Sequence, residues 1–183
     1  MSTTPHPADP VDPDRPTSSA VRPARVEDVP ALDALVHHLA AYEREPEAVE
    51  ATPDDLRRAL FGPAPRVHCL VAEVDGEVAG MALWFLTYST WRGRHGIWLE
   101  DLVVHADHRG SGLGRALLAA LAAECTSRGL ARLEWSVLDW NAPARGFYAA
   151  LGAAPQEEWT TWRLDGGALD ALGSAAPPPP SGP

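Results

Sequence analysis

The chain has 183 residues, enough for one ordinary domain and too few for two full-sized ones. All 15 of its basic side chains are arginine, and with 25 aspartate and glutamate residues the formal net charge is −10. Such an acidic chain is poorly suited to the phosphate backbone of nucleic acids and better suited to small cations. We therefore expect no nucleic-acid partner.

The prolines gather at the two ends of the chain. Five of the 18 prolines lie in residues 1–16 and five in residues 177–183. Segments of this composition bury too little apolar surface to fold. We predict a disordered Pro-rich tail over 1–19, a single domain over 20–166, and a C-terminal tail over 167–183 that is disordered at its end.

The two cysteines, Cys69 and Cys125, lack the spacing of a disulfide framework or a metal site. The scattered histidines also lack ligand spacing, so we expect no metal. No apolar run reaches the roughly 18 residues that cross a bilayer, and the N-terminus lacks the apolar core of a signal peptide. We predict a cytoplasmic protein with two buried, reduced thiols and no membrane partner.

The predicted domain begins with a short strand over 20–24. Asp28 then stands at the N-cap position of a helix whose apolar residues follow the helical period. A second helix begins at Thr52-Pro53, with proline at the first helical position and acids in the first turn, and it ends at Gly62.

Three strands follow these helices. The β-rich runs over 67–74 and 78–88 are separated by Asp75-Gly76, a dipeptide that favours a tight hairpin turn. A loop then leads to a strand over 97–104.

The remaining elements alternate between helix and strand. A helix rich in alanine and leucine is predicted over 112–128, then a strand over 131–138 and a short helix over 143–151. A last strand is predicted over 158–164. This order indicates a mixed α/β domain built on one sheet.

The most informative segment is the glycine-rich turn between the strand at 97–104 and the helix at 112–128. Glycines let the backbone approach a ligand closely, and the free N–H groups at a helix N-terminus bind phosphate oxygens without a lysine. The spacing does not match the dinucleotide fingerprint G-x-G-x-x-G, and a P-loop needs a lysine that the chain lacks. What remains is R-x-x-G-x-G, from Arg109 to Gly114.

This sequence resembles the pyrophosphate-binding motif of the GCN5-related N-acetyltransferase (GNAT) superfamily, where the motif binds coenzyme A. The alternative is a strand-to-helix turn that serves topology alone. The resemblance implies an α/β (α+β) GNAT fold, with one mixed sheet of six or seven strands flanked by about four helices. It implies acetyl-CoA as co-substrate, bound at Arg109, Gly110, Ser111, Gly112, Leu113, Gly114 and Arg115.

Residues 139–153, DWNAPARGFYAALGA, resemble the later motif of the superfamily, in which an asparagine precedes a short helix that carries Phe-Tyr. In the resemblance, Tyr148 protonates the departing coenzyme A thiolate and Asn141 lies beside the coenzyme arm. A phenol is a reasonable acid for a thiolate of similar basicity. The structural alternative is an aromatic side chain packed in the core beside Phe147.

A narrower resemblance covers most of residues 20–165. The sequences LVAEV, TYSTWRG and LEDL are similar to the spermidine/spermine (diamine) acetyltransferase branch, which includes thialysine acetyltransferases. The branch implies a small-molecule amine substrate and a homodimer. It implies that Tyr42 and Glu43 contact the amine and that Glu100 helps to remove its proton, directly or through water. The pantetheine arm would bind to backbone groups of Leu102, Val103 and Val104.

The sequence departs from this branch at Ser89-Thr90, where an aspartate is expected. The acids Glu157-Glu158 near the last predicted strand are displaced by two tryptophans. Fewer carboxylates would therefore face a long polycation. Thialysine, a shorter diamine or another primary amine thus stay open as substrates. Trp91 is a further candidate for the amine pocket, through a cation–π contact.

The expected reaction is direct transfer in a ternary complex. Glu100 and Asp101 are adjacent on a strand, so regular alternation lets at most one face the cleft, and the resemblance selects Glu100. A backbone N–H near Leu102 is the expected donor to the oxyanion. A covalent route through Cys69 or Cys125 is disfavoured, because both thiols are expected to be buried and inert.

Two other functions stay open at this point. One is a catalytically idle acyl-CoA-binding module that regulates a partner, although such a module needs neither Glu100 nor Tyr148. The other is acetylation of a protein or peptide, which no feature of the sequence specifies.

Overall fold

The computed structural model describes residues 19–177. These residues form two compact units, the first ending at Ser136 and the second beginning at Val137, and each is described by itself. The tail expected over 1–19 lies outside the described residues except for Ser19, and so does the end of the C-terminal tail from residue 178.

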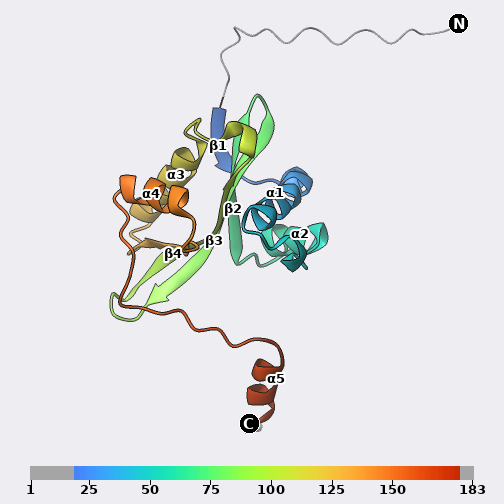
Figure 1. Ribbon diagram of the computed structural model, residues 1–183, viewed down its shortest axis with the longest axis vertical. Coiled ribbons are helices and arrows are strands. Elements are labelled where there is room, and N and C mark those ends of the chain that lie inside the picture. The colour runs from blue at the N-terminus through green and yellow to red at the C-terminus, as the bar shows by residue number, and fades with distance from the viewer. Residues whose placement is uncertain (1–18, 178–183) are drawn as a thin grey trace, which may run out of the picture. The chain divides into compact units, whose positions relative to one another are not determined.

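The first unit contains one sheet and three α-helices (Figure 1). The strands pair in the order β1-β2-β3-β4-β5, antiparallel as far as β4, and β5 runs parallel to β4. The elements in chain order are β1 (Ser19–Pro23), α1 (Val29–Tyr42), α2 (Pro53–Phe61), β2 (Val67–Val74), β3 (Glu77–Ser89), β4 (Arg94–Val104), α3 (Leu113–Ser127) and β5 (Leu133–Glu134).

The helices cover both faces of this sheet, with α1 and α2 on one face and α3 on the other (Figure 1). A core cluster on the first face joins Leu32 and Leu35 of α1 to Val71, Met81 and Val103 of the three central strands. Burying each of these side chains contributes roughly 1.5–3 kcal/mol. The core therefore anchors the C-terminal half of β4 against α1.

Local signals placed the β2–β3 hairpin and the start of α2 correctly. Asp75 and Gly76 have φ of 52° and 91°, the positive values that a type I′ turn requires. At α2, the Thr52 hydroxyl accepts a hydrogen bond from the Asp55 backbone N–H, and the Asp55 carboxylate accepts one from the Thr52 N–H. This capping box starts the helix at Pro53 as predicted.

Asp28 precedes α1 as predicted, but its side chain does not cap that helix. Its carboxylate accepts a 2.7 Å hydrogen bond from the backbone N–H of Arg25, closing a 3₁₀ turn over Val26–Asp28. It also forms a bidentate ion pair with Arg22, whose Nη1 and Nη2 donate hydrogen bonds of 2.7 and 2.9 Å to its two oxygens. The arginine competes successfully for the carboxylate because a charged donor binds it more strongly than a helix N–H.

The second unit contains two helices, α4 (Ala142–Ala150) and α5 (Gly166–Ser174). The first agrees with the helix predicted over 143–151. The second lies within the segment where a C-terminal tail is predicted, over 167–183, and that prediction of a tail stays untested. Leu169 and Leu172 of α5 are exposed.

The strand predicted over 158–164 is absent from the described residues, and this prediction was wrong. Trp159, Trp162 and Leu164 remain exposed. A strand needs a partner that supplies its backbone hydrogen bonds, and no strand lies in the described part of the second unit. The local sequence of 158–164 alone does not provide that partner.

The strand predicted over 131–138 is reduced to the two residues of β5. Because the strand predicted over 158–164 is absent, the sheet of the described chain has five strands instead of six or seven. The β4–β5 ladder ends at the pair Trp98–Glu134, immediately before a bulge in β4. A bulge bends and twists its strand, which moves the two backbones out of register. The mixed α/β fold with one sheet is confirmed. Among residues 19–177, none of the helices combines the length and the apolar character that spanning a bilayer requires.

Candidate active site

A bulge in the middle of β4 separates the two adjacent acids. Leu99 pairs with Trp84 and Asp101 with Leu83, so Glu100 is the extra residue without a partner on β3. Asp101 lies in register with Leu83 and, on β2, with Cys69, which belongs to the core under α1. The expectation that only one acid could face the cleft assumed regular alternation, and the bulge removes that constraint.

Glu100 is exposed, but its carboxylate is held in place. Its Oε2 accepts a 2.8 Å hydrogen bond from the indole Nε1 of Trp98. Trp98 pairs with Phe85, which is two residues from Leu83 and therefore on the same face of β3. The bulge thus brings the Glu100 carboxylate toward the face that carries Asp101.

Asp101 is the acid whose protonation is most altered. Burial raises the pKa of its carboxyl to about 6, and the negative charges of Glu100 and Glu43 contribute in the same direction. Glu43 follows the last residue of α1, and burial raises the pKa of that carboxyl as well. Three acids, one just after α1 and two on β4, therefore share one electrostatic environment.

We call this group of acids (Glu43, Glu100 and Asp101) the β4 acid cluster. The arginine salt bridges found within residues 19–177 go to other carboxylates. Holding unpaired negative charges in a partly buried place costs free energy, and a bound cation lowers this cost. The cluster is therefore suited to a protonated amine.

The glycine turn lies where β4 leads into α3, as the sequence predicted. Gly110 and Gly112 have φ of 80° and 91°, and apart from each glycine and its two chain neighbours no atom lies within 4 Å of the position that a Cβ would take. Gly112 is the N-cap of α3 and offers no side-chain cap. The first N–H groups of the helix, at Leu113, Gly114 and Arg115, have no intrahelical acceptor and are available to an anion.

The C-terminal half of β4 presents an edge. Leu102, Val103 and Val104 pair with Ala82, Met81 and Gly80 of β3, whereas the ladder with β5 has already ended at Trp98. Within the described residues, no strand covers the other side of this segment. Alternate residues of such an edge direct their N–H and C=O groups outward, where an amide-containing ligand can pair with them.

Arg109 and Tyr42 are brought together although 67 positions separate them in the sequence. Tyr42 is the last residue of α1, and the guanidinium carbon of Arg109 lies 4.7 Å from the centre of its ring. The structure thus joins the predicted coenzyme turn to the predicted amine contacts of α1.

Trp91 is not brought into this arrangement. It lies at the tip of the β3–β4 hairpin and is 89% exposed. The six residue-to-residue steps along β4 from Arg94 to Glu100 span about 20 Å, so Trp91 is distant from the acid cluster of its own chain.

Asn141 and Tyr148 lie in the second unit, on the short helix that the sequence predicted. The side-chain oxygen of Asn141 accepts a 3.2 Å hydrogen bond from the Ala144 N–H and caps α4. The Tyr148 ring lies 5.3 Å from that of Phe147. The asparagine at this position thus has a structural role at the helix start.

The thiols do not have the character of nucleophiles. Both cysteines are buried, and burial raises the pKa of Cys69 to about 12, so this thiol stays protonated near neutral pH. Burial also raises the pKa of Cys125. The expectation of buried thiols is confirmed. Over residues 19–177, no three His, Cys, Asp or Glu side chains form a group that could hold a metal.

Sequence reasoning missed His38 and rejected Asp101. His38 lies on α1 one helical turn before Tyr42, and its Nε2 is 3.0 Å from Nη2 of Arg109. The i, i+4 spacing from Tyr42 was a usable signal for His38. For Asp101 the signal was absent, because neither the bulge nor the burial is visible in the sequence.

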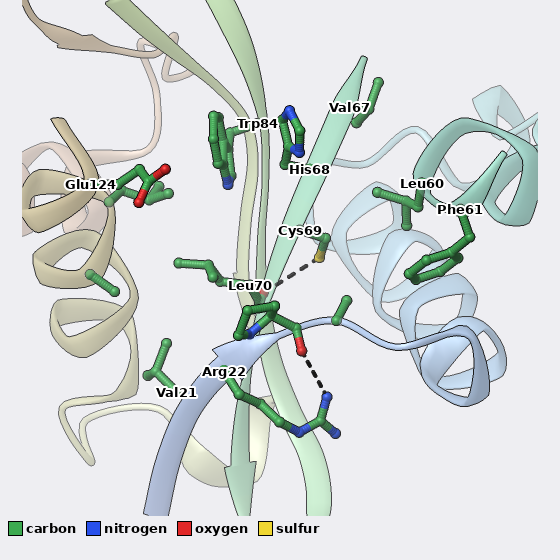
Figure 2. A pocket seen from close by; sticks show the side chains of 14 residues that line it. Val21, Arg22, Leu60, Phe61, Val67, His68, Cys69, Leu70, Trp84 and Glu124 are labelled. Atoms are coloured by element: carbon green, nitrogen blue, oxygen red, sulfur yellow. Dashed lines mark hydrogen bonds between the residues drawn. The ribbon is translucent and has the colours of Figure 1, made fainter. Parts of the chain in front are cut away.

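A cavity of about 340 Å³ lies elsewhere, at the sheet edge where β1 ends beside β2 (Figure 2). Most of its lining is apolar. Its two charged residues already have partners, Arg22 with Asp28 and Glu73, and Glu124 with Arg128. Neither the β4 acid cluster nor the glycine turn lines it, so we place the candidate active site at β4.

A family model described as "Acetyltransferase (GNAT) family" matches residues 32–153, which make up two thirds of the chain and contain the candidate site residues. The chain belongs to the GNAT acetyltransferase family. GNAT acetyltransferases use acetyl-CoA, and the open glycine turn and the free β4 edge fit such a ligand.

Named relatives agree with this assignment. Thialysine N-epsilon-acetyltransferase of Bos taurus is 37% identical over 163 residues, which cover 83% of this chain and 95% of the relative. L-ornithine N5-acetyltransferase of Arabidopsis thaliana is 29% identical and covers 84% of this chain and 87% of the relative. The protein is therefore a GNAT N-acetyltransferase that transfers an acetyl group to an amine.

Solved structures show the same GNAT fold. An integron cassette protein from the mobile metagenome of V. cholerae superposes with a TM-score of 0.74 at 24% identity, over 86% of this chain and 99% of its own. An aminoglycoside acetyltransferase from an uncultured soil sample superposes with a TM-score of 0.67 at 15% identity, over 80% and 97%. At these identities the likeness supports the fold alone.

Proposed function

We propose that the protein acetylates a primary amine of a small cationic molecule such as thialysine, ornithine, a diamine or a polyamine. The observation that carries the proposal is the β4 acid cluster, in which the half-buried Asp101 has its pKa raised to about 6 beside Glu43 and Glu100. The names of the thialysine and ornithine acetyltransferase relatives support the same substrate class. The formal charge of −10 favours the approach of a cation.

Acetyl-CoA would be held by backbone groups along two neighbouring segments. The β4 edge at Leu102–Val104 would pair with the amide groups of the pantetheine arm, and the turn from Arg109 to Arg115 would bind the pyrophosphate. Asn141 would lie beside the arm. When bound, the co-substrate supplies the thioester carbonyl that the amine attacks.

The acids would hold the amine and take its proton. A protonated amine has no lone pair, so one carboxylate has to accept a proton before attack. Asp101 is suited to this role because its pKa of about 6 lies near the operating pH, while Glu100, held by Trp98, would orient the ammonium or relay the proton through water. Tyr42 and Glu43 would contact the remainder of the substrate.

Two donors would complete a direct transfer within one ternary complex. A backbone N–H near Leu102 would stabilise the oxyanion, and Tyr148 would protonate the departing thiolate. The raised thiol pKa of Cys69 supports direct transfer over a covalent route. Homodimer formation stays a prediction that sedimentation of the purified protein measures.

A thiol-release assay with acetyl-CoA tests the substrate class. The amine panel contains thialysine, ornithine, diamines, polyamines, an aminoglycoside and a basic peptide, and we expect turnover of the small amines. Glu43→Gln should raise the KM for the amine, whereas Glu45→Gln changes an exposed acid two residues away and should not. Turnover of the peptide alone, or of no amine, would contradict the proposal.

A further inference from the structure

Arg109 is held by three contacts that join the end of β4 to the C-terminal half of α1. Its Nε donates a 3.3 Å hydrogen bond to the carbonyl oxygen of Val104, and its Nη2 lies 3.0 Å from Nε2 of His38. Its guanidinium group lies over the Tyr42 ring. His38 and Tyr42 are four residues apart and share one face of α1. These contacts leave Nη1 of Arg109 for another acceptor.

The contact with Arg109 requires a neutral His38. A guanidinium has only donors and keeps its charge, so Nε2 of His38 has to accept the hydrogen bond. A neutral imidazole with its proton on Nδ1 can do this. An imidazolium would direct an N–H at an N–H and place a like charge 3.0 Å away, so protonation breaks the contact.

The groups around His38 favour its neutral form. Burial lowers the pKa of His38, and the positive charge of Arg109 and the neighbouring His105 lower it further. The His105 ring stacks on it with centroids 5.2 Å apart, and only Asp107 acts in the opposite direction. Because the folded-state pKa lies below the usual value, the contact is present above that lowered pKa and is lost as the pH falls through it.

We propose that His38 is a positioning residue whose neutral imidazole holds Arg109 against Tyr42 and thereby sets the guanidinium at the coenzyme turn. The inference rests on the proposed function, in which Arg109 binds the pyrophosphate and Tyr42 the amine. Helix α1 then supports both binding sites. Loss of the His38 acceptor weakens coenzyme binding without altering a group that touches the reacting atoms.

Calorimetric titration with coenzyme A, without an amine, tests this role between about pH 5.5 and about pH 8. His38→Leu removes the acceptor, and we expect about three- to tenfold weaker binding at the alkaline end. His38→Gln keeps an amide oxygen that does not titrate, so it should bind as the wild type does there and lose less affinity toward acid pH. Ionisation of coenzyme A affects the wild type and the variants equally. The ratio of wild-type to variant affinity at each pH therefore reports on His38 alone.

A matched control and steady-state kinetics separate positioning from stability. His37→Gln changes the exposed neighbour on the same helix and should alter neither the affinity nor its pH dependence. His38→Leu should raise the KM for acetyl-CoA and leave kcat nearly unchanged.

Two results would overturn the inference. One is equal affinity of the wild type and His38→Leu at alkaline pH, and the other is a His38→Gln variant with the full wild-type pH dependence. Failure of the wild type to bind coenzyme A at any pH would instead overturn the proposed function.

Discussion

Trp98 donates a 2.8 Å hydrogen bond from its indole Nε1 to Oε2 of Glu100, two residues further along β4. Glu100 is the extra residue of the β4 bulge, and without this bond its side chain would be unrestrained at the surface. The indole therefore holds the bulged acid toward the face that carries Asp101. Two carboxylates thus become available to one amine, which a regular strand does not allow.

Replacing Asp101 tests which carboxylate takes the proton. A base has to be deprotonated to act, so kcat/KM of the wild type should fall as the pH drops through about 6. Asp101→Asn should lower kcat/KM about 100-fold and abolish this acidic limb. The pH profiles of Asp101→Asn and Glu100→Gln are compared directly.

The control for this prediction is Glu77→Gln, an exposed acid at the first residue of β3. It should keep the wild-type profile. If Asp101→Asn retains the acidic limb and Glu100→Gln loses it, Glu100 is the base.

Tyr148→Phe tests the proposed general acid. Only the leaving-group step needs the hydroxyl, so we expect kcat to fall about 100-fold while coenzyme A affinity changes little. Tyr88→Phe removes the same hydroxyl from an exposed tyrosine of β3 and should leave kcat unchanged. Full activity of Tyr148→Phe would remove this residue from the mechanism.

Gly112→Ala tests the backbone of the glycine turn. An alanine at φ 91° costs about 1–2 kcal/mol of stability, and its methyl group enters the open space beside the N-terminus of α3. We expect a lower midpoint of urea unfolding and a raised KM for acetyl-CoA.

The matched control is Gly76→Ala in the β2–β3 turn, where φ is also 91° and the Cβ position is equally open. It should cost similar stability and leave the KM unchanged. Equal KM effects in the two variants would show that the glycine turn does not contact the coenzyme.

The ion pair of Arg22 and Asp28 should make stability depend on pH. Asp28 is 9% exposed, and its hydrogen bonds with Arg22 hold the pKa of its carboxyl below the usual value. A depressed pKa gives stability that is complete above the unfolded-state pKa and is lost as the pH falls through the folded-state value.

Asp28→Asn should therefore lower the free energy of unfolding by about 3 kcal/mol near neutral pH and by less in acid, as urea titrations measure. Asp54→Asn breaks the exposed pair with Arg57 and should have no measurable effect. Equal losses in the two variants would contradict the role of the Arg22–Asp28 pair.

Local signals predicted most of the fold. The turn at Asp75-Gly76 and the cap at Thr52 depend on backbone conformation and on neighbours within three residues, so they were readable directly. The prediction of a strand over 158–164 failed because a strand does not depend on local neighbours alone. Its residues have the composition of a strand, but pairing depends on a distant segment that a local sequence does not identify.

The sequence by itself determined the kind of protein. The glycine turn before α3 and the Asn-Phe-Tyr segment each lie in a single stretch of chain, so their resemblance to GNAT motifs needed no tertiary information. The absence of lysine excluded the rival phosphate loop.

Only the tertiary structure decided the chemistry of the candidate site. The pKa of Asp101 comes from burial and from the charges of Glu43 and Glu100, and Glu43 reaches β4 only through the packing of α1. The contact between His38 and Arg109 joins residues 71 positions apart. Protonation depends on solvent access and on charges a few ångströms away, and both are set by folding rather than by neighbours in the chain.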